Sequence, residues 1–392
     1  MSTITGWDAQ LPLGEDHLQA NFWLPHDGMR KRNRKLLKRF CGLSQAKIID
    51  VAQTESQKPK VNIVLAGFII VESRWLDCSG TNTCIAAQVT VLYSFLYVDL
   101  CFTLLQSNDD GWAESYIRSF NDALIAAGHD VVLSAPAEDQ SGTGSSDAPP
   151  TPRTEACHYN SCIGNGSPTG HNASRPDLNW VNSFPVTSMK YGITTFGPQL
   201  WNGSAPQLAV SGINVGTNVF VQLPFSGTVN AATFAARAGI PSIAFSAASV
   251  GRIPFDIDPT PLRSILYGQL ATQLTNKILS SGTPYLPPDV FLNVNFPKAE
   301  GSCTDLSSFK WVLSRINPGI ISPPDVDHCG GNRLPTELTV ITHAGCFISV
   351  SVGNAQDKRT APNSKQAVVL KKLRDMLTCL PTQHIQSQKI LQ

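Results

Sequence analysis

The sequence predicts an α/β fold, a doubly wound and mostly parallel sheet, from about residue 100 onward. Apolar runs of strand length alternate there with helix-length segments of helical periodicity, which is typical of parallel strands joined by crossover helices. Polar side chains gather where several of these runs end, and those ends form the ligand-binding edge of an open parallel sheet. Only 15% of residues are charged, whereas Gly and Pro number 29 and 27, so we expect long ordered loops between short elements.

The first strand is predicted near 101–106 and the first helix near 113–127, where Gly128 is well placed to end the helix. The run DVVLSAP from Asp130 predicts a second strand. The segment from 142 to 183 is rich in Ser, Gly, Pro and Asn and shows neither helical nor strand periodicity. We expect a long loop there, ordered by a pair of cysteines.

The next three elements repeat the alternation. QLAVSGIN (207–214) predicts a buried strand, SGTVNAATFAARAG (226–239) a capped helix, and IPSIAFSA (240–247) the following strand. Together with the first two strands they predict a sheet wound on both faces.

The C-terminal part predicts a helix from Pro259 to Leu279 and a strand at 289–297. The runs at 309–316 and 337–353 predict further strands, which we expect to form a C-terminal β-hairpin extension of the sheet. An amphipathic helix at 363–380 is expected to close the fold.

The chain is expected to divide into an N-terminal extension at 1–95, one domain at 96–382 and a short tail at 383–392. The sequence assigns no role to the extension. Three origins are consistent with it: a genuine extension, a mistaken gene start, or a displaced secretion signal. Its basic stretch at 30–40 favours a solvated helix over a nuclear or nucleic-acid signal.

One apolar stretch, 85–105, is about as long as a membrane span. It contains Gln88 and Asp99 and runs into an acidic pair, so we interpret it as a strand with its lead-in or as the remains of a secretion signal. No stable membrane span is expected.

The net charge is +1, from 30 basic and 29 acidic residues, so no overall field points to a nucleic acid duplex or an acidic membrane as partner.

The ten cysteines have no zinc-site spacing and favour disulfides. Glycosylation sequons begin at Asn165, Asn172 and Asn202. Cysteines and sequons together predict a secreted glycoprotein in an oxidising compartment.

The cysteines that we expect to pair fall into two groups. Cys157 and Cys162 flank a short loop, whereas the other four allow three pairings between which the sequence does not choose: Cys303, Cys329, Cys346 and Cys379.

Hard oxygen ligands follow three predicted strands. The first strand is followed by Asp109 and Asp110, the second by Ser141, and the third ends in Asn214 with Asn218 shortly after. Singly, each is more commonly a turn or cap residue. Jointly, two carboxylates, a hydroxyl and an amide oxygen predict a site for a divalent cation, Mg²⁺ or Mn²⁺.

Ser226, Gly227 and Thr228 open a predicted helix, whose free N–H groups and dipole suit a phosphate. An N-cap serine is the simpler interpretation and is compatible with phosphate binding. A cation beside this helix start indicates phosphate-ester chemistry through a metal-activated water. The sequence contains no Walker A loop, no dinucleotide-binding glycine motif and no nucleophile elbow.

Four motifs, SNDDG, APAEDQSGTGSS, VSGINVGTN and FSGTVNAA, occur in this order between 107 and 232. In order and spacing they resemble the SurE survival-protein family of metal-dependent 5'/3'-nucleotidases and acid phosphatases, and the C-terminal part with its cysteines resembles the secreted fungal branch. The resemblance covers roughly 100–380 and implies a SurE-type, Rossmann-like fold.

The resemblance also implies residue roles. Asp109, Asp110, Ser141 and Asn214 would hold the metal, with the two aspartates as catalytic residues. Asn218, Ser226, Gly227 and Thr228 would contact the phosphate.

This chain departs from the family pattern in two places. Bacterial members usually carry Gly-Asp-Asp where this chain has 220–222, and Pro-Gly where it has 114–115. Substrate choice and oligomer contacts that depend on those loops are therefore not implied by the resemblance.

The first functional hypothesis is a phosphomonoesterase that acts on a nucleotide or another small phosphate monoester and forms a homodimer or higher homo-oligomer. The alternative is a secreted binding protein that keeps the fold without turnover.

Overall fold

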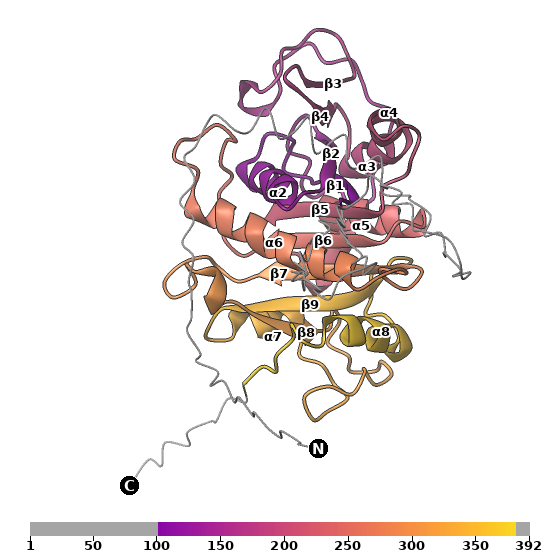
Figure 1. Ribbon diagram of the computed structural model, residues 1–392, viewed down its shortest axis with the longest axis vertical. Helices are drawn as coiled ribbons and strands as arrows, with labels where there is room; N and C mark the ends of the chain where they lie inside the picture. The colour runs from indigo at the N-terminus through magenta and orange to yellow at the C-terminus, as the bar shows by residue number, and fades with distance from the viewer. Residues whose placement is uncertain (1–100, 382–392) are drawn as a thin grey trace, which may run out of the picture. The chain divides into compact units, whose positions relative to one another are not determined.

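The computed structural model describes residues 101–381. These residues form a nine-stranded sheet with the strand order β3-β4-β2-β1-β5-β6-β7-β9-β8 (Figure 1). The strands are β1 Thr103–Ser107, β2 Asp130–Pro136, β3 Thr169–Asn172, β4 Arg175–Val181, β5 Leu208–Val215, β6 Ser242–Ala247, β7 Val290–Phe296, β8 Lys310–Ser314 and β9 Phe347–Asn354. The six central strands from β4 to β7 are all parallel, so the predicted fold class is confirmed.

The helices lie on both faces of the sheet. They are α2 Ser115–Ala126, α3 Pro185–Tyr191, α4 Gly197–Leu200, α5 Gly227–Arg237, α6 Leu262–Ser280, α7 Glu337–Thr342 and α8 Asn363–Leu373, with a π-helical turn at Gly192–Phe196 and short 3₁₀ segments at His158–Asn160, Phe220–Phe225 and Leu306–Ser308. Gly128 follows α2 with a φ of 91°, the left-handed conformation expected after a helix end. None of the helices within 101–381 combines the length and the apolar character that crossing a bilayer requires.

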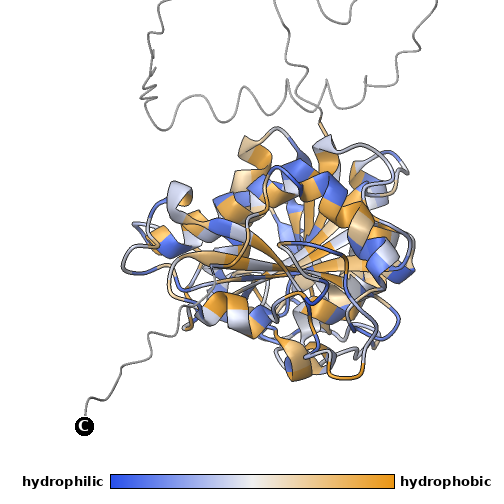
Figure 2. Ribbon diagram, turned by 90° about the horizontal axis from the view of Figure 1, so that it is seen from below, coloured by the Kyte–Doolittle hydropathy of each residue, from blue (hydrophilic) through white to orange (hydrophobic). Residues whose placement is uncertain are grey.

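Neighbouring residues of each strand pack on opposite faces. Leu104 of β1 packs with Tyr116 and Phe120 of α2, whereas Leu105 packs with Met189 of α3 and Ala231 of α5. Because side chains alternate along a strand, a run such as TLLQS buries apolar residues on both sides, and Figure 2 shows these apolar strands inside the helical layers. Helices α2, α6 and α8 share one face, and α3 and α5 share the other.

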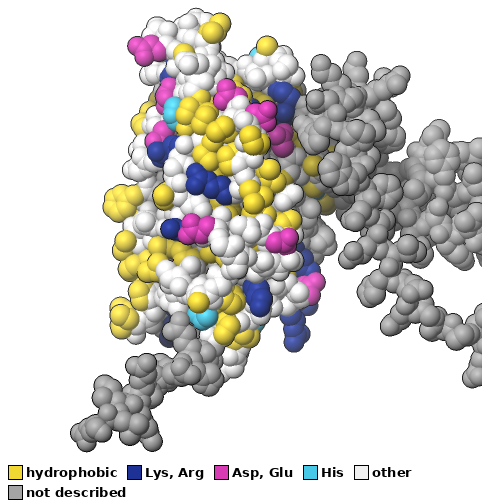
Figure 3. Space-filling model, turned by 90° about the vertical axis from the view of Figure 1, so that its left-hand side faces the viewer, with side chains coloured by type: hydrophobic (Ala, Val, Ile, Leu, Met, Phe, Trp, Pro, Cys, Tyr) yellow, Lys and Arg dark blue, Asp and Glu magenta, His cyan; other side chains and the backbone are white. Residues whose placement is uncertain are grey.

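The surface carries no dominant sign of charge on the face shown in Figure 3, where acidic and basic side chains are interspersed among hydrophobic and neutral ones. This agrees with the near balance of charges in the sequence.

The segment 142–183 differs from the prediction. It contains β3 and β4, and β4 joins the central sheet parallel to β2. The strand is short, contains Pro176 and buries the polar Asp177 and Asn179 next to Leu178 and Trp180, so its apolar signal is weak. The amide of Asn179 donates to the Leu133 carbonyl of β2 over 3.1 Å.

The C-terminal strands also differ from the prediction. β8 and β9 do extend the sheet, but they are parallel to each other, and β9 is antiparallel to β7, so they form no hairpin. The first six residues of the predicted strand 337–353 are helix α7, which Thr336 caps through the Thr339 N–H. This helix lies between the two strands in the chain and makes the crossover that a parallel pair requires. The closing helix α8 ends at Leu373 rather than near 380.

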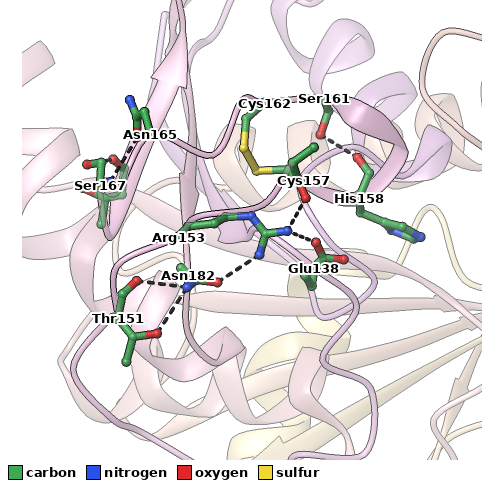
Figure 4. The surroundings of a disulfide bond; sticks show 12 residues. Glu138, Thr151, Arg153, Cys157, His158, Ser161, Cys162, Asn165, Ser167 and Asn182 are labelled. Atoms are coloured by element: carbon green, nitrogen blue, oxygen red, sulfur yellow. Dashed lines mark hydrogen bonds and ion pairs between the residues drawn. A yellow bond between two sulfur atoms is a disulfide. The ribbon is translucent and has the colours of Figure 1, made fainter.

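Three disulfides lie within the described residues. Cys157 pairs with Cys162, as its position around a short loop indicated, and the other four cysteines pair as Cys303–Cys346 and Cys329–Cys379. Arg153 contacts Glu138 and Asn182 beside the first disulfide and so ties this loop to the end of β4 (Figure 4).

The N-terminal extension 1–95 and the tail 383–392 lie outside the described residues, as do the basic stretch and most of the apolar stretch 85–105. The domain boundaries stay predictions.

Candidate active site

The predicted site residues follow strands that lie side by side. β1 is the middle strand between β2 and β5, and Ser107 at its end is aligned with Ser211 of β5. Asp109 and Asp110 come directly after this end, and both carboxylates are buried, with 2% and 0% exposure. Such burial is costly for a charged group unless it is hydrogen-bonded or paired with a cation, so the contacts of this pair decide its role.

Asp109 is held by the start of α5. The Thr228 hydroxyl donates to its Oδ1 over 2.6 Å, and the Thr228 backbone N–H donates to its Oδ2 over 3.0 Å. A Cβ on Gly227 would lie 2.7 Å from the Asp109 Cβ, so only glycine lets the helix start approach this closely. The SGT motif therefore brings α5 against the first aspartate.

Asp110 is held by two other segments. Its Oδ2 accepts from the Val215 N–H at the end of β5 over 2.8 Å, and its Oδ1 accepts from Arg252 Nε over 2.8 Å. Burial raises the pKa of Asp110 well above its usual value, and the adjacent Asp109 charge raises it further, while Val215 and Arg252 act in the opposite direction. Burial also raises the pKa of Asp109 despite the two bonds from Thr228.

Asn214 reaches the site through a bulge in β5. The register with β6 shifts between Ser211 and Asn214, so that three steps along β5 match two along β6. Gly212 has a φ of 116°, and a Cβ there would lie 2.2 Å from the Phe245 carbonyl oxygen, which explains the glycine. The Asn214 amide donates to the Gly216 carbonyl over 2.7 Å, and its Oδ1 lies 3.4 Å from the Thr228 hydroxyl.

Ser141 lies at the exposed rim, in the loop after β2. Its hydroxyl accepts from Arg252 Nη2 over 2.9 Å, and its backbone N–H donates to Asp139 Oδ1 over 3.0 Å. The preceding Gln140 N–H donates to the Asp109 carbonyl over 2.7 Å. The loop that carries Ser141 is thus tied to the first aspartate.

These residues fit a divalent cation. Each of the four carboxylate oxygens of the aspartate pair accepts from one protein donor, and a carboxylate oxygen can accept about two interactions, so each retains a lone pair for a cation. The neighbouring Asn108 Oδ1 is buried and has no hydrogen-bond partner within residues 101–381. Carboxylate, hydroxyl and amide oxygens are the ligands that Mg²⁺ and Mn²⁺ prefer.

The side chains of Ser226 and Thr228, which were expected to contact phosphate, both bond to protein groups. Ser226 caps α5 by accepting from the Val229 N–H over 3.1 Å. Thr228 is fully buried, and its one hydroxyl proton is directed at Asp109. Two N–H groups of the first helical turn, those of Thr228 and Val229, therefore already bond to protein oxygens.

Asn218 lies in a buried polar network. Its amide donates to the Ser246 hydroxyl over 2.8 Å, and its backbone carbonyl accepts from the amides of Asn293 and Asn295. These bonds fix the course of the chain between β5 and α5. Phosphate contact by Asn218 and by the helix start stays a prediction.

Two residues of the site were missed by the sequence analysis, Arg252 and Asp139. Arg252 lies in the loop between β6 and α6, outside every motif, although it follows a strand that ends at the same edge. Asp139 stands inside the quoted APAEDQSG run, and its carboxylate lies 3.0 Å from Arg252 Nη2. Both residues could have been found by considering every polar residue that follows a strand end, and not only those within the motifs.

The sequons occur at two kinds of position. Asn165 and Asn202 are exposed, whereas Asn172 is half-buried and its side chain accepts from Ser174 and Arg175 within a turn. Glycosylation stays a prediction.

Comparison with known proteins gives a consistent set of relatives. A family model described as "Survival protein SurE" matches residues 104–315. An acid phosphatase of Yarrowia lipolytica is 28% identical over 281 residues, which cover 64% of this chain and 78% of that protein. The 5'-nucleotidase SurE of Lawsonia intracellularis is 34% identical over 194 residues, which cover 50% of this chain and 65% of that protein.

Among solved structures, the SurE protein from Aquifex aeolicus aligns with a TM-score of 0.46 and 23% identity, over 70% of this chain and 100% of that one. The match to the bacterial nucleotidase spans just under two thirds of that protein's length.

Proposed function

Because the chain belongs to the SurE family, we propose that it hydrolyses phosphate monoesters, as a 5'/3'-nucleotidase or acid phosphatase that depends on a divalent cation. The observation that carries this proposal is the buried pair Asp109 and Asp110, whose four oxygens are each oriented by a protein donor and each retain acceptor capacity. The names of the relatives, acid phosphatase and 5'-nucleotidase, support the same reaction class.

In this proposal Asp109, Asp110, Ser141 and Asn214 hold the cation, Mg²⁺ or Mn²⁺. A divalent cation held there lowers the pKa of water and offsets negative charge on the phosphoryl group. Thr228 and Val215 keep the two carboxylates in place through their bonds to Asp109 and Asp110.

The substrate is proposed to be a nucleoside monophosphate or another small phosphate monoester. Its phosphate would lie beside the start of α5, at Ser226 and Gly227, and next to the aspartate pair. The dipole of α5 favours an anion at this end, which offsets part of the repulsion from the carboxylates.

The three disulfides support an oxidising compartment, and we propose a secreted protein on this basis. Oligomer formation remains a prediction that size-exclusion chromatography with light scattering would test.

The test is phosphate release from an aryl phosphate and from 5'-AMP and 3'-AMP. Purified protein should release phosphate in Mg²⁺ or Mn²⁺, lose this activity in excess chelator, and regain it when the cation is restored. Protein that stays folded and binds phosphate but releases none from any ester would instead support the non-catalytic binding protein.

A further inference from the structure

Arg252 lies outside the sequence motifs, yet its side chain contacts three residues of the candidate site. Its Nε donates to Asp110 Oδ1 over 2.8 Å, and its Nη2 lies 2.9 Å from the Ser141 hydroxyl and 3.0 Å from Asp139 Oδ1. The side chain is 35% exposed, so part of it is accessible to solvent. Among the described lysines and arginines for which ion pairs are found, it is the one that pairs with these carboxylates.

The backbone around Arg252 is fixed against the segment that follows the aspartate pair. The Ser115 N–H donates to the Ile253 carbonyl over 2.8 Å, and the Phe255 N–H donates to the Ala113 carbonyl over 3.0 Å. Glu114, at the cap of α2, accepts from the Ile253 N–H over 3.3 Å. Arg252 is therefore placed by pairing of the segment that directly follows it with residues 113–115, and not by its side chain alone.

The site needs a positive group for the substrate. A phosphate ester carries about two negative charges near neutral pH and would approach Asp109, Asp110 and Asp139. Two N–H groups of the first turn of α5 are already bonded to protein oxygens. Arginine has a planar fork of five donors that matches phosphate geometry, and Arg252 Nη1 makes no hydrogen bond to a described residue.

We propose that Arg252 binds the phosphate group of the substrate and is a further catalytic residue of this site. The proposal rests on the proposed hydrolysis of phosphate monoesters. Asp110 holds the guanidinium through Nε, and Ser141 and Asp139 hold it through Nη2, which leaves the two N–H donors of Nη1 for phosphate oxygens.

The test compares Arg252→Gln and Arg252→Lys with Arg237→Gln, a matched control on the exposed last turn of α5. Inorganic phosphate is titrated calorimetrically in saturating Mn²⁺, and Mn²⁺ is titrated separately without phosphate. Arg252→Gln should weaken phosphate binding by roughly 10- to 100-fold, the range for lost hydrogen bonds to a charged group. Arg252→Lys should weaken it less, since it keeps the charge, and Arg237→Gln should leave it unchanged.

The cation titration separates a phosphate role from competition for the cation's ligands. Unchanged phosphate affinity in Arg252→Gln overturns the proposal, and tighter Mn²⁺ binding alone would assign Arg252 to competition with the cation. If Arg252→Gln does not fold, Arg252→Met takes its place, and unchanged phosphate affinity in that variant overturns the proposal equally.

The experiments distinguish a failure of the proposed hydrolysis from a failure of the proposed role of Arg252. A wild-type protein that binds phosphate but cleaves no ester refutes hydrolysis, while the phosphate titration still decides the role of Arg252. A wild-type protein that binds no phosphate in Mn²⁺ overturns the role of Arg252, while phosphate release from the esters still decides hydrolysis.

Discussion

Two of the sites at which the described residues bury carboxylates differ in their surroundings. Asp109 and Asp110 lie at the end of β1, whereas Asp325 lies in the loop between β8 and α7. Asp325 pairs with the buried Arg315, and its oxygens also accept from the Leu334 N–H and the Gln366 amide, each over 3.0 Å.

The difference lies in how fully each carboxylate is compensated. Asp325 has a buried cationic partner of its own and two further donors, so its charge is neutralised within the protein. The aspartate pair has one cationic partner, the partly exposed Arg252, which contacts Asp110 and is itself shared with Asp139. Burial raises the pKa values of Asp109 and Asp110. Complete compensation indicates a structural role, and incomplete compensation indicates a site that awaits a charged ligand.

Asp110→Asn should have the largest effect on activity. It keeps the shape and one acceptor for the Val215 N–H but removes the ligand charge, so we expect kcat/KM to fall by about 10²- to 10³-fold or more. Without divalent cation, the melting temperature should stay the same or rise, since an uncompensated buried charge is lost. Asp375→Asn, on the exposed surface, serves as the control. Near-normal turnover would remove Asp110 from the catalytic machinery.

Asp325→Asn should show the opposite pattern. It leaves the Arg315 guanidinium buried without its anion, which costs about 3–5 kcal/mol of unfolding free energy. Activity per folded molecule should not change, because the residue has no contact with the site. Urea unfolding measures the first quantity and titrated activity the second. A stable but inactive variant would contradict the distinction between the two clusters.

Loss of the Cys303–Cys346 disulfide should lower the free energy of unfolding more than loss of the Cys157–Cys162 disulfide. The Cys303–Cys346 bond closes 43 residues and the Cys157–Cys162 bond only 5, so chain entropy predicts losses of about 4 and about 2 kcal/mol when each pair is replaced by serine. Chemical denaturation of the two double variants measures the difference. Equal losses would show that chain entropy does not dominate here.

Glu337 is a further buried carboxylate, and its effect on stability is smaller and depends on pH. It accepts from the Asn293 amide over 2.7 Å, and burial raises its pKa to about 8. Between its unfolded value and about pH 8 the folded protein binds the extra proton, so stability falls as pH rises, by at most about 1.4 kcal/mol per pH unit.

Glu337→Gln should flatten this part of the stability curve relative to the wild type. Other buried carboxylates, such as Glu114 with a pKa raised to about 7, contribute with the same sign and remain in both proteins. The difference between the two curves, measured by denaturation from pH 5 to 8, therefore isolates Glu337. Parallel curves would show that Glu337 does not titrate as expected.

The sequence by itself determined the elements whose signal is local. The apolar periodicity of β1, β2, β5 and β6 and of the helices between them depends on neighbouring residues, and the polar residues after each strand end are visible without any fold. The parallel arrangement of those strands then implies that Asp109, Asp110, Ser141 and Asn214 meet at one edge.

Only the tertiary structure decided contacts between distant segments. Arg252 and Asp110 are separated by 142 positions, Thr228 and Asp109 by 119, and Cys329 and Cys379 by 50, and no local pattern encodes these distances. The parallel pairing of β8 with β9 likewise depends on the crossover through α7. Such contacts form only when the core brings loops from distant parts of the chain together. A sequence pattern reports on neighbouring residues and therefore does not indicate which distant side chains will meet.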